Sequence, residues 1–333
     1  MEKIKKITND TVEYNNAVKL INSNGLNFSG DVDFLWGFFC NNKLKGICGY
    51  QYNVIKYLVV DVQYQGENIS SKLLTSVTNE MFDSGIEDIY VYTGRCNLQK
   101  FKNMGFEEVY STSKTSLLEG GKANISSFLE EIKNSKTYIK NHEGDISSIV
   151  MNCNPFTEGH RFLIEKASEE NNLVVVFILE EDRSYFSFEE RFEMVKKGTY
   201  DLSNVLVVPS SKYMISSATF PSYFLKEENL KNEEYMDLDL KIYSKIICPS
   251  LKIKTRYVGE EPYCKITKKY NKKMKEILEK NGIDVKIVFR KEANGKAISA
   301  SKVRKSIKEN KFEEIKNLVP NTTYEYIKEK LRK

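Results

Sequence analysis

Short apolar runs separated by glycine and asparagine turns dominate the first third of the chain. Some runs alternate as half-buried strands do, and two other patterns have helical spacing. The strand-like runs cover residues 34–40, 45–52, 57–62, 88–92 and 107–111, and the helical patterns cover residues 70–81 and 98–106. This mixture predicts an α+β domain. After Leu117 the pattern weakens, and the polar stretch 134–144 is the expected connection to a second domain.

The pattern changes from residue 146 onward. Near-continuous apolar runs at 146–151 and 173–179 are typical of strands covered on both faces in a parallel sheet. Further strands are expected at residues 205–208, 254–258 and 285–289, with amphipathic helices at residues 159–170, 188–197 and 267–280. This alternation predicts a doubly wound, Rossmann-like α/β domain. We therefore expect an α+β domain over residues 1–140 and the α/β domain over residues 145–333.

Length and composition fit two domains of this kind. The chain has 333 residues, and its 41% of hydrophobic residues are enough to build a core in each domain. Its 51 basic and 46 acidic residues leave a net charge of +5. Both signs are interspersed, without the basic block that a nucleic-acid-binding arm would show. We therefore expect no nucleic-acid partner, while a phosphorylated ligand is compatible with the mild positive charge.

Cysteine usage and the N-terminal residues bear on the compartment. The six cysteines have no C-x-x-C spacing and no nearby histidine, which indicates ordinary reduced thiols. The N-terminus lacks the apolar core of a signal peptide, and no window reaches the roughly 18 apolar residues that span a bilayer. We expect a cytoplasmic protein that is not embedded in a membrane.

The segment NCNPFTEGH, residues 152–160, lies where the first strand of the second domain is expected to turn into its first helix. Ligands of such sheets bind beyond the carboxyl ends of strands, and a helix N-terminus attracts phosphate. The turn has one glycine, Gly159, so side chains must supply part of a phosphate contact. His160, one of only two histidines, suits donation to a phosphate oxygen, with Thr157 close by. A helix-capping threonine beside an incidental histidine is the alternative.

A second candidate segment, ISASKVR, covers residues 298–304 and opens a late helix. Ser299, Ser301, Lys302 and Arg304 place hydroxyls and two cations around another helix N-terminus, which suits phosphate binding. Arginine is scarce, with eight residues against 43 lysines, so a role for Arg304 in binding an anion is favoured. The alternative is a serine-capped helix with basic residues on its solvent face.

Taken together, T-x-G-H after the first strand and I-S-x-S-x-x-R before a late helix resemble the nucleotidyltransferase superfamily. Its members transfer a nucleoside monophosphate from a triphosphate and release pyrophosphate. Sequence blocks between residues 150 and 304 narrow the resemblance to the citrate lyase ligase family: VMNCNPFTEGHRFLIEKA, SYFSFEERFEMVKKGTYDLSNVLVV, SSATFPSYFLK, VGEEPYCKITKKYNKKM and ISASKVR. FPSYF and GEEP are not shared by nucleotidyltransferases generally. The family also carries an N-terminal acetyltransferase-like domain, which residues 1–140 would supply.

This resemblance implies an AMP-forming ligase that uses ATP and acetate. Its substrate would be the thiol of the phosphoribosyl dephospho-coenzyme A group on the acyl carrier subunit of citrate lyase, which it would acetylate. A site with one histidine and several cations is sufficient for attack on the α-phosphorus of ATP, because acetate is already ionised at neutral pH and needs no general base.

The resemblance also implies roles for individual residues. His160 and Thr157 would hold the phosphates, with His160 at the α-phosphorus. The departing β,γ portion would be bound by Ser299, Ser301, Lys302 and Arg304. Further nucleotide contacts are expected from Asn154, Phe156, Gly159, Glu260 and Arg183. Mg²⁺ would be bound mainly through the phosphates, so no metal ligands are assigned.

Other candidates rest on position alone. Arg191 and Lys212, like Arg183, follow strands and would contact the triphosphate unless they form surface salt bridges. The block SSATFPSYF supplies Thr219, Phe220 and Tyr223 as candidates for an acetate pocket, with a packed loop as the equal alternative. Glu260 and Glu261 would orient the ribose or bind magnesium, although an acidic turn before proline also explains them.

In the first domain, VVDVQYQGENISSKLL, residues 59–74, resembles the pyrophosphate-binding turn of the GNAT acetyltransferases, in which a strand leads through Q/R-x-x-G-x-G/A into a helix. Gln63 and Gly66 match, but Asn68 stands where the family has glycine or alanine and would crowd the pyrophosphate. The segment KFKNMGFEEV at residues 100–109 resembles the end of the same fold. A GNAT-like fold is therefore expected without acetyl transfer, either as a scaffold or as a cleft for the coenzyme A-like arm of the carrier.

Two other functions remain open for the whole chain. The phosphate-binding segments would serve equally in an adenylyltransferase that makes a dinucleotide cofactor, although FPSYF, GEEP and the first domain favour the ligase. A non-catalytic module that binds an acyl carrier is the other possibility, and the presence of both phosphate-binding segments speaks against it.

Overall fold

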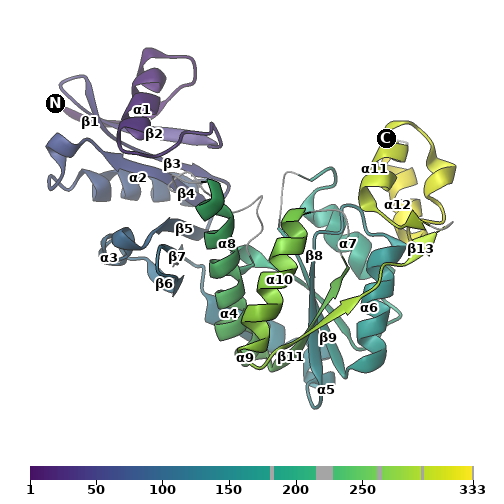
Figure 1. Cartoon of the computed structure of the whole chain (residues 1–333). Coiled ribbons are helices and arrows are strands. Elements are labelled where there is room, and N and C mark those ends of the chain that lie inside the picture. The colour runs from purple at the N-terminus through teal and green to yellow at the C-terminus, as the bar shows by residue number, and fades with distance from the viewer. Residues whose placement is uncertain (181–183, 215–227, 261–264, 294–295, 332–333) are drawn as a thin grey trace. The chain divides into compact units, whose positions relative to one another are not determined.

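The computed structural model describes residues 1–180, 184–214, 228–260, 265–293 and 296–331. The chain forms two compact units (Figure 1). Unit 1 comprises residues 1–125 and 219–238, and unit 2 comprises residues 126–218 and 239–333. A compact unit is not by itself a domain that folds alone, so the limits 1–140 and 145–333 stay a prediction. The stretch 134–144, expected as a connection, contains helix α5 within unit 2.

Unit 1 is built on a seven-stranded sheet in the order β1-β2-β3-β4-β5-β7-β6. Neighbouring strands are antiparallel except for β4 and β5, which are parallel. The strands are β1 (Glu2–Ile7), β2 (Phe34–Cys40), β3 (Lys43–Gln51), β4 (Val54–Val60), β5 (Asp88–Gly94), β6 (Glu107–Ser111) and β7 (Thr115–Gly121). Helices α1 (Val12–Ser23), α2 (Ile69–Asp83) and α3 (Leu98–Asn103) and the 3₁₀ turns η1 (Val62–Tyr64) and η2 (Arg95–Asn97) connect them.

Opposite faces of this sheet are covered by different helices. Leu73 and Val77 of α2 pack with Phe38 of β2, whereas Ala17 and Ile21 of α1 pack in a separate cluster with neighbouring strand residues that point the other way. Apolar side chains that alternate along the strands therefore pack into two separate cores, one on each face of the sheet. The order of elements confirms the predicted α+β, GNAT-like fold, although β1, α1 and β7 were not predicted.

Part of unit 1 comes from a distant stretch of sequence. Residues 228–238 of helix α8 (Glu228–Ile242) belong to this unit. The Glu234 carboxylate is buried and accepts hydrogen bonds from the hydroxyls of Thr112 at 2.9 Å and Thr115 at 3.3 Å. These contacts anchor α8 to the β6–β7 hairpin, because a buried carboxylate requires such donors.

Unit 2 contains a five-stranded, all-parallel sheet in the order β10-β9-β8-β11-β12. Its strands are β8 (Ile146–Met151), β9 (Leu173–Ile178), β10 (Val205–Pro209), β11 (Ile253–Gly259) and β12 (Asp284–Val288). The chain starts at the central strand, moves to one edge and returns to the other side, so the strand order reverses between β8 and β11. This confirms the predicted Rossmann-like sheet, and the reversal marks where ligands of such folds bind.

Helices of unit 2 flank the sheet. They are α4 (Ile125–Lys133), α5 (Lys136–Asn141), α6 (Glu158–Glu170), α7 (Phe188–Gly198), α9 (Cys248–Leu251), α10 (Lys265–Glu279), α11 (Ala300–Lys308) and α12 (Asn321–Leu331). Short elements are η3 (Ser211–Tyr213), a π-helical turn η4 (Tyr243–Ile247), η5 (Phe312–Ile315) and the β13 (Glu292–Ala293) and β14 (Lys296–Ala297) hairpin. One core joins α6, α7, α11 and α12 to one sheet face.

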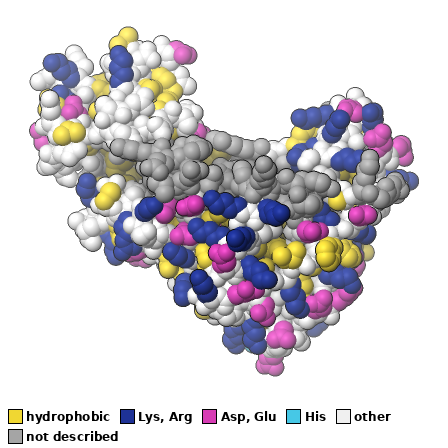
Figure 2. Space-filling view, viewed as in Figure 1, with side chains coloured by type: hydrophobic (Ala, Val, Ile, Leu, Met, Phe, Trp, Pro, Cys, Tyr) yellow, Lys and Arg dark blue, Asp and Glu magenta, His cyan; other side chains and the backbone are white. Residues whose placement is uncertain are grey.

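On the face shown in Figure 2, charged side chains of both signs are interspersed among the described residues, in keeping with the small net charge. Within the described ranges, we find no helix with the length and apolar character needed to cross a bilayer.

Candidate active site

The first candidate segment forms the turn between β8 and α6. Thr157 is the N-cap of α6, and its hydroxyl accepts a hydrogen bond from the backbone N–H of His160 at 3.3 Å. In return, the backbone N–H of Thr157 donates to Nδ1 of His160 at 3.1 Å. This reciprocal capping box fixes the orientation of the imidazole ring at the carboxyl edge of the sheet.

The same contacts determine the protonation of His160. Burial, together with the positive charge of Arg290, lowers the pKa of His160 to about 4, so the ring is neutral at pH 7. Nδ1 accepts the Thr157 N–H, which assigns the remaining ring proton to Nε2. His160 is therefore a neutral N–H donor. In this form the ring can donate a hydrogen bond to a phosphate oxygen while it stays uncharged.

Phe156 supports this ring from behind. It is fully buried, and its ring stacks on the imidazole with 6.1 Å between centroids and 10° between planes. Gly198 at the end of α7 allows the close fit, because a Cβ there would lie 2.5 Å from Cε1 of Phe156. Phe156, expected as a nucleotide contact, offers no exposed surface and positions His160 instead.

The second candidate segment lies directly beside the first. Nη1 of Arg304 on α11 donates a hydrogen bond to the main-chain carbonyl of Asn154, 150 residues earlier in the chain. Ile298 lies against the turn as well, since a Cβ at Gly159 would be 3.6 Å from its side chain. The N-termini of α6 and α11 therefore lie side by side.

No side-chain cap uses the backbone N–H donors at the N-terminus of α11. Ser299 is the N-cap but makes no side-chain capping bond, and its hydroxyl donates to that of Ser301 at 3.3 Å. Lys302 in the first turn is exposed, and its side chain has no hydrogen bond or ion pair with the described residues. Backbone N–H groups, two hydroxyls and one cation are therefore available to an anion.

Strands β11 and β12 add residues at the same carboxyl edge. Glu260 follows β11, and its carbonyl accepts a hydrogen bond from Nε of Arg290 at 2.8 Å. Lys291 next to it pairs with Glu158 of α6 at 2.8 Å. Neither basic residue was predicted for the site. Arg290 had a recognisable signal, because it is one of eight arginines and lies two residues after β12 of the parallel sheet.

Several expected residues serve other purposes or lie outside the description. Arg191 is 0% exposed and donates to the carbonyls of Asn152 at 2.7 Å, Leu179 at 2.9 Å and Phe186 at 3.3 Å. It therefore supports the ends of β8 and β9 from inside, which corrects the expectation of either a triphosphate contact or a surface salt bridge. Lys212 donates to the Glu180 carbonyl at 3.5 Å. Candidates outside the described residues are Arg183, Thr219, Phe220, Tyr223 and Glu261.

The side chain of Asn154 is also engaged in holding the turn. Its Oδ1 accepts a hydrogen bond from the backbone N–H of Phe186 at 3.2 Å. In the described parts of the chain, no group of three histidine, cysteine or acidic side chains is arranged to bind a metal ion.

Comparison with known proteins addresses the whole chain. Residues 146–327 match the family model described as citrate lyase ligase C-terminal domain. The citrate (pro-3S)-lyase ligase of Haemophilus influenzae is 34% identical over 92% of this chain and 92% of its own length. That of Klebsiella pneumoniae is 33% identical over 86% and 84%, and that of Escherichia coli is 32% identical over 93% and 88%.

Solved structures similar to this chain cover about a third of it. They include a GNAT family acetyltransferase from Elizabethkingia anophelis with acetyl-CoA bound, at 17% identity and a TM-score of 0.28 over 36% of this chain and 97% of that one. A GNAT family acetyltransferase from Staphylococcus aureus has 17% identity and a TM-score of 0.31 over 37% and 100%. With relatives more than 30% identical along nearly its whole length, this chain belongs to the citrate lyase ligase family of enzymes.

Proposed function

We propose that the protein activates acetate with ATP and transfers the acetyl group to the prosthetic-group thiol on the acyl carrier subunit of citrate lyase. The relatives are named as ligases of citrate lyase, which supports that enzyme as the target. The observation that carries the nucleotide chemistry is the hydrogen bond from Arg304 to the Asn154 carbonyl. It links α11 to the turn before α6, which supports one site formed by the two helix N-termini, the His160 imidazole and nearby basic side chains.

In the first step, a carboxylate oxygen of acetate attacks the α-phosphorus of ATP. The bond from that phosphorus to the bridging oxygen breaks, and the products are acetyl-adenylate and pyrophosphate. Negative charge grows on the phosphate oxygens, so donors placed in advance lower the barrier. Nε2–H of His160 is proposed to donate to an α-phosphate oxygen, while Thr157 and Phe156 keep the ring in place.

The departing pyrophosphate requires cations and N–H groups on its own side. Lys302, Arg304 and the α11 N-terminus with Ser299 and Ser301 are proposed to bind it. Arg290 is proposed to add positive charge next to His160. The residues Asn154, Gly159 and Glu260 would shape the nucleotide pocket, with Glu260 near the ribose, and Arg183 remains a candidate contact.

In the second step, the carrier thiol attacks the acetyl carbon. The bond to the adenylate oxygen breaks, a thioester forms, AMP leaves and the thiol proton goes to solvent. Magnesium, the usual companion of ATP, would neutralise phosphate charge.

The proposal is tested by isotope exchange between ATP and pyrophosphate, which should require acetate. Incubation with ATP, acetate and deacetylated citrate lyase should then add the mass of one acetyl group to the carrier subunit. Exchange that depends instead on a nucleotide or a pantetheine phosphate would identify an adenylyltransferase. Absence of any exchange would support a non-catalytic carrier-binding module.

A matched pair of lysines tests the site itself. Lys302 and Lys305 are both exposed on α11, but Lys305 belongs to the next turn and pairs with Glu309 at 3.8 Å. Lys302→Met should raise the KM for ATP about tenfold or more, as expected for loss of a hydrogen bond to a charged group. Lys305→Met should leave it unchanged. Equal effects would contradict the assignment of Lys302.

A further inference from the structure

Helix α10 has an unusual order of charges along its length. Residues 265–275 include six lysines and no acidic residue, while Glu276 and Glu279 lie in the last turns. The opposite order stabilises a helix, because its N-terminus carries a partial positive charge and its C-terminus a partial negative one. Helix stability therefore does not account for lysines at this end, whereas binding of a negatively charged partner does.

Three exposed lysines of α10 form one stripe. Lys268, Lys272 and Lys275 are spaced by four and three residues, so they lie on the same side of the helix. Lys275 pairs with Glu279 at 3.7 Å. Lys268 and Lys272 have no hydrogen bond or ion pair with the described residues. The two cations nearest the start of the helix are therefore available to a partner.

The start of α10 lies at the carboxyl edge of the parallel sheet. This helix connects β11 to the neighbouring parallel strand β12, so it runs antiparallel to both and begins where β11 ends. Its buried residues Met274 and Leu278 are not part of the core on the α6 side, so α10 covers the opposite face. Glu260, which accepts the hydrogen bond from Arg290, precedes α10 by five residues. The lysine stripe therefore begins near the candidate active site.

Exposed apolar side chains lie on the same face of the sheet as α10. Lys286 of β12 donates to Glu170 of α6 at 2.7 Å, and Val288 packs against the core on that side. Alternate residues of a strand point to opposite faces, which places Ile287 and Phe289 on the side of α10. Ile287 is 51% exposed, and Phe289, which directly follows β12, is 78% exposed.

An exposed aromatic ring near unpaired cations has the composition of a protein-binding surface. Aromatic anchors surrounded by polar side chains carry much of the binding energy of protein interfaces. On the face drawn in Figure 2, hydrophobic and basic side chains lie next to one another where Figure 1 draws α10. The apolar side of α10 is packed at Met274 and Leu278, so it is not free to enter a lipid surface. The surface therefore fits an acidic protein that also offers an apolar contact.

We infer that Lys268, Lys272 and Phe289 form the docking surface for the acyl carrier subunit, with acidic side chains of the carrier at the two lysines and an apolar contact at Phe289. This inference rests on the proposed function, which makes the carrier a protein substrate. The prosthetic group is attached to the carrier, so the carrier must bind where its thiol reaches the acetyl-adenylate. Phe289 directly precedes Arg290, which contacts Glu260, so this surface borders the proposed site of adenylation.

The lysines are tested in the full chain with two matched pairs of substitutions. Lys268→Gln with Lys272→Gln removes two charges near the carboxyl edge, whereas Lys254→Gln with Lys280→Gln removes two exposed charges at the opposite edge of the same sheet. The first pair should raise the KM for deacetylated citrate lyase about tenfold at low salt, and the second should leave it unchanged. Added salt should raise the wild-type KM and affect the first pair much less. Equal effects of the two pairs, or a wild-type KM that salt does not change, would overturn the inference.

The aromatic anchor has its own control. Tyr200 is 81% exposed and precedes β10, so it lies at the opposite edge of the sheet. Phe289→Ser should raise the KM for citrate lyase about tenfold and leave the KM for ATP in the exchange assay and the urea midpoint unchanged, while Tyr200→Ser should change none of them. A raised KM for ATP in Phe289→Ser would assign the ring to the nucleotide pocket and overturn the inference. Light scattering that shows a dimer dissociated by Phe289→Ser, with an unchanged KM for citrate lyase, would assign the surface to a second copy of the chain and also overturn it.

A binding measurement separates this inference from the proposed function. Binding of deacetylated citrate lyase to the immobilised full chain requires no turnover, and Lys268→Gln with Lys272→Gln should weaken it about tenfold. If the wild type shows no acetate-dependent exchange but this weakening occurs, the proposed function fails and the docking surface stands. If exchange is normal and the substitutions leave binding unchanged, the docking surface alone fails.

Discussion

The protonation state of His160 gives the sharpest prediction. Its pKa is lowered from 6.5 to about 4 by burial and by Arg290. At pH 7 about one ring in a thousand would then be charged. Protonating the folded protein there costs about 4 kcal/mol, at 1.36 kcal/mol per pH unit. A catalytic role for this ring must therefore use the neutral Nε2–H.

The low pKa also links folding to pH. Between pH 6.5 and 4 the unfolded chain binds a proton at this position while the folded protein does not, so the free energy of unfolding falls as the pH is lowered through this window. The difference between 6.5 and 4 corresponds to about 3 kcal/mol. His160→Gln has no titrating group, and the wild type should lose about this much stability relative to it between pH 7 and pH 4.

Nuclear magnetic resonance measures the titration directly. The chain has two histidines, so a His142→Gln variant with labelled histidine gives a single imidazole signal. Its chemical shift should stay at the neutral value from pH 8 to about pH 5.5. A midpoint between pH 6 and 7 would refute the assignment of a neutral donor.

Two substitutions separate donation from helix capping in the same ring. His160→Gln places an amide N–H near Nε2 but loses the acceptor at Nδ1, while His160→Asn keeps an acceptor near Nδ1 and loses the donor. We expect exchange to fall about 10²–10³-fold in His160→Asn, as for loss of one oxyanion donor, and less in His160→Gln. The reverse order would mean that capping, and not donation, is what the reaction requires.

Further predictions concern residues around this ring. Arg304→Lys should raise the KM for ATP in the exchange assay about tenfold, since an ammonium cannot reproduce the planar geometry of the guanidinium. Arg191→Met leaves three buried carbonyls without their donor and should lower the free energy of unfolding in urea by about 3–5 kcal/mol, whereas Lys197→Met on the same helix should change it by less than about 0.5 kcal/mol. Gly198→Ala should force the Phe156 ring toward His160, which lowers kcat for exchange and destabilises the protein by about 1–3 kcal/mol in the same unfolding assay.

Elements with a continuous or alternating apolar pattern could be predicted from the sequence. Strands β2, β6 and β8 have the expected bounds, because every residue of these short runs contributes to a continuous or alternating pattern. The convergence of residues 152–160 and 298–304 was also predictable, since parallel strands and the helices that follow them place such turns at one edge. The hydrogen bond between Arg304 and Asn154 is a specific instance of this rule.

Helix α8 could not be predicted in the same way. Its buried positions include Glu234 and Asp239, which interrupt any apolar stripe. The Glu234 carboxylate accepts hydrogen bonds from the hydroxyls of Thr112 and Thr115, and the Tyr270 hydroxyl donates to Asp239 at 2.5 Å. A buried acidic residue looks like a surface residue until its partners are known, and these partners lie far away in the sequence.

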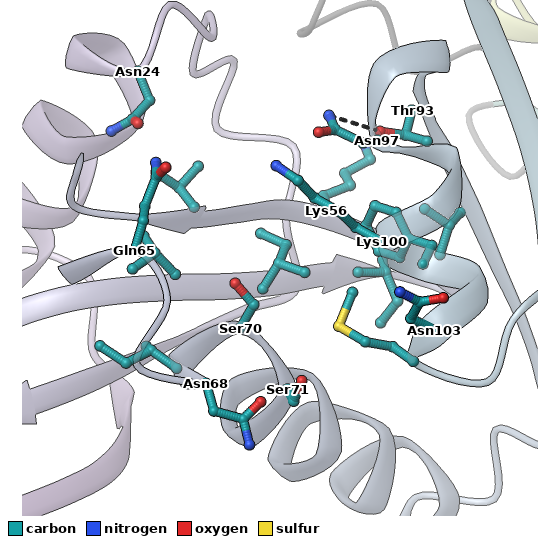
Figure 3. Close-up of a pocket in the computed structure, with 18 of the residues that line it drawn as sticks. Asn24, Lys56, Gln65, Asn68, Ser70, Ser71, Thr93, Asn97, Lys100 and Asn103 are labelled. Atoms are coloured by element: carbon teal, nitrogen blue, oxygen red, sulfur yellow. Dashed lines mark hydrogen bonds between the residues drawn. The ribbon is translucent and has the colours of Figure 1, made fainter.

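Arg191 illustrates the same limit for a site residue. Its position after a strand suggested a ligand contact, but its partners are main-chain carbonyls, which leave no trace in the sequence. Asn68 shows a related limit. Its side-chain size predicts crowding of a pyrophosphate, but the sequence does not show that its backbone is left-handed and that its amide points away from the strands (Figure 3). Both outcomes depend on backbone geometry and not on residue type.

The neutral state of His160 implies a division of labour within the proposed site. An imidazolium next to Arg290 would oppose a like charge, so the positive charge that ATP needs must come from groups that stay charged, namely Arg290, Lys302, Arg304 and the two helix N-termini. The imidazole then contributes direction, because the Thr157 capping box fixes where Nε2–H points. In this arrangement the permanent charges bind ATP and the oriented neutral ring activates it. His160 does not titrate between pH 6 and 8, so we expect it to cause no change in the KM for ATP or in the exchange rate over this range.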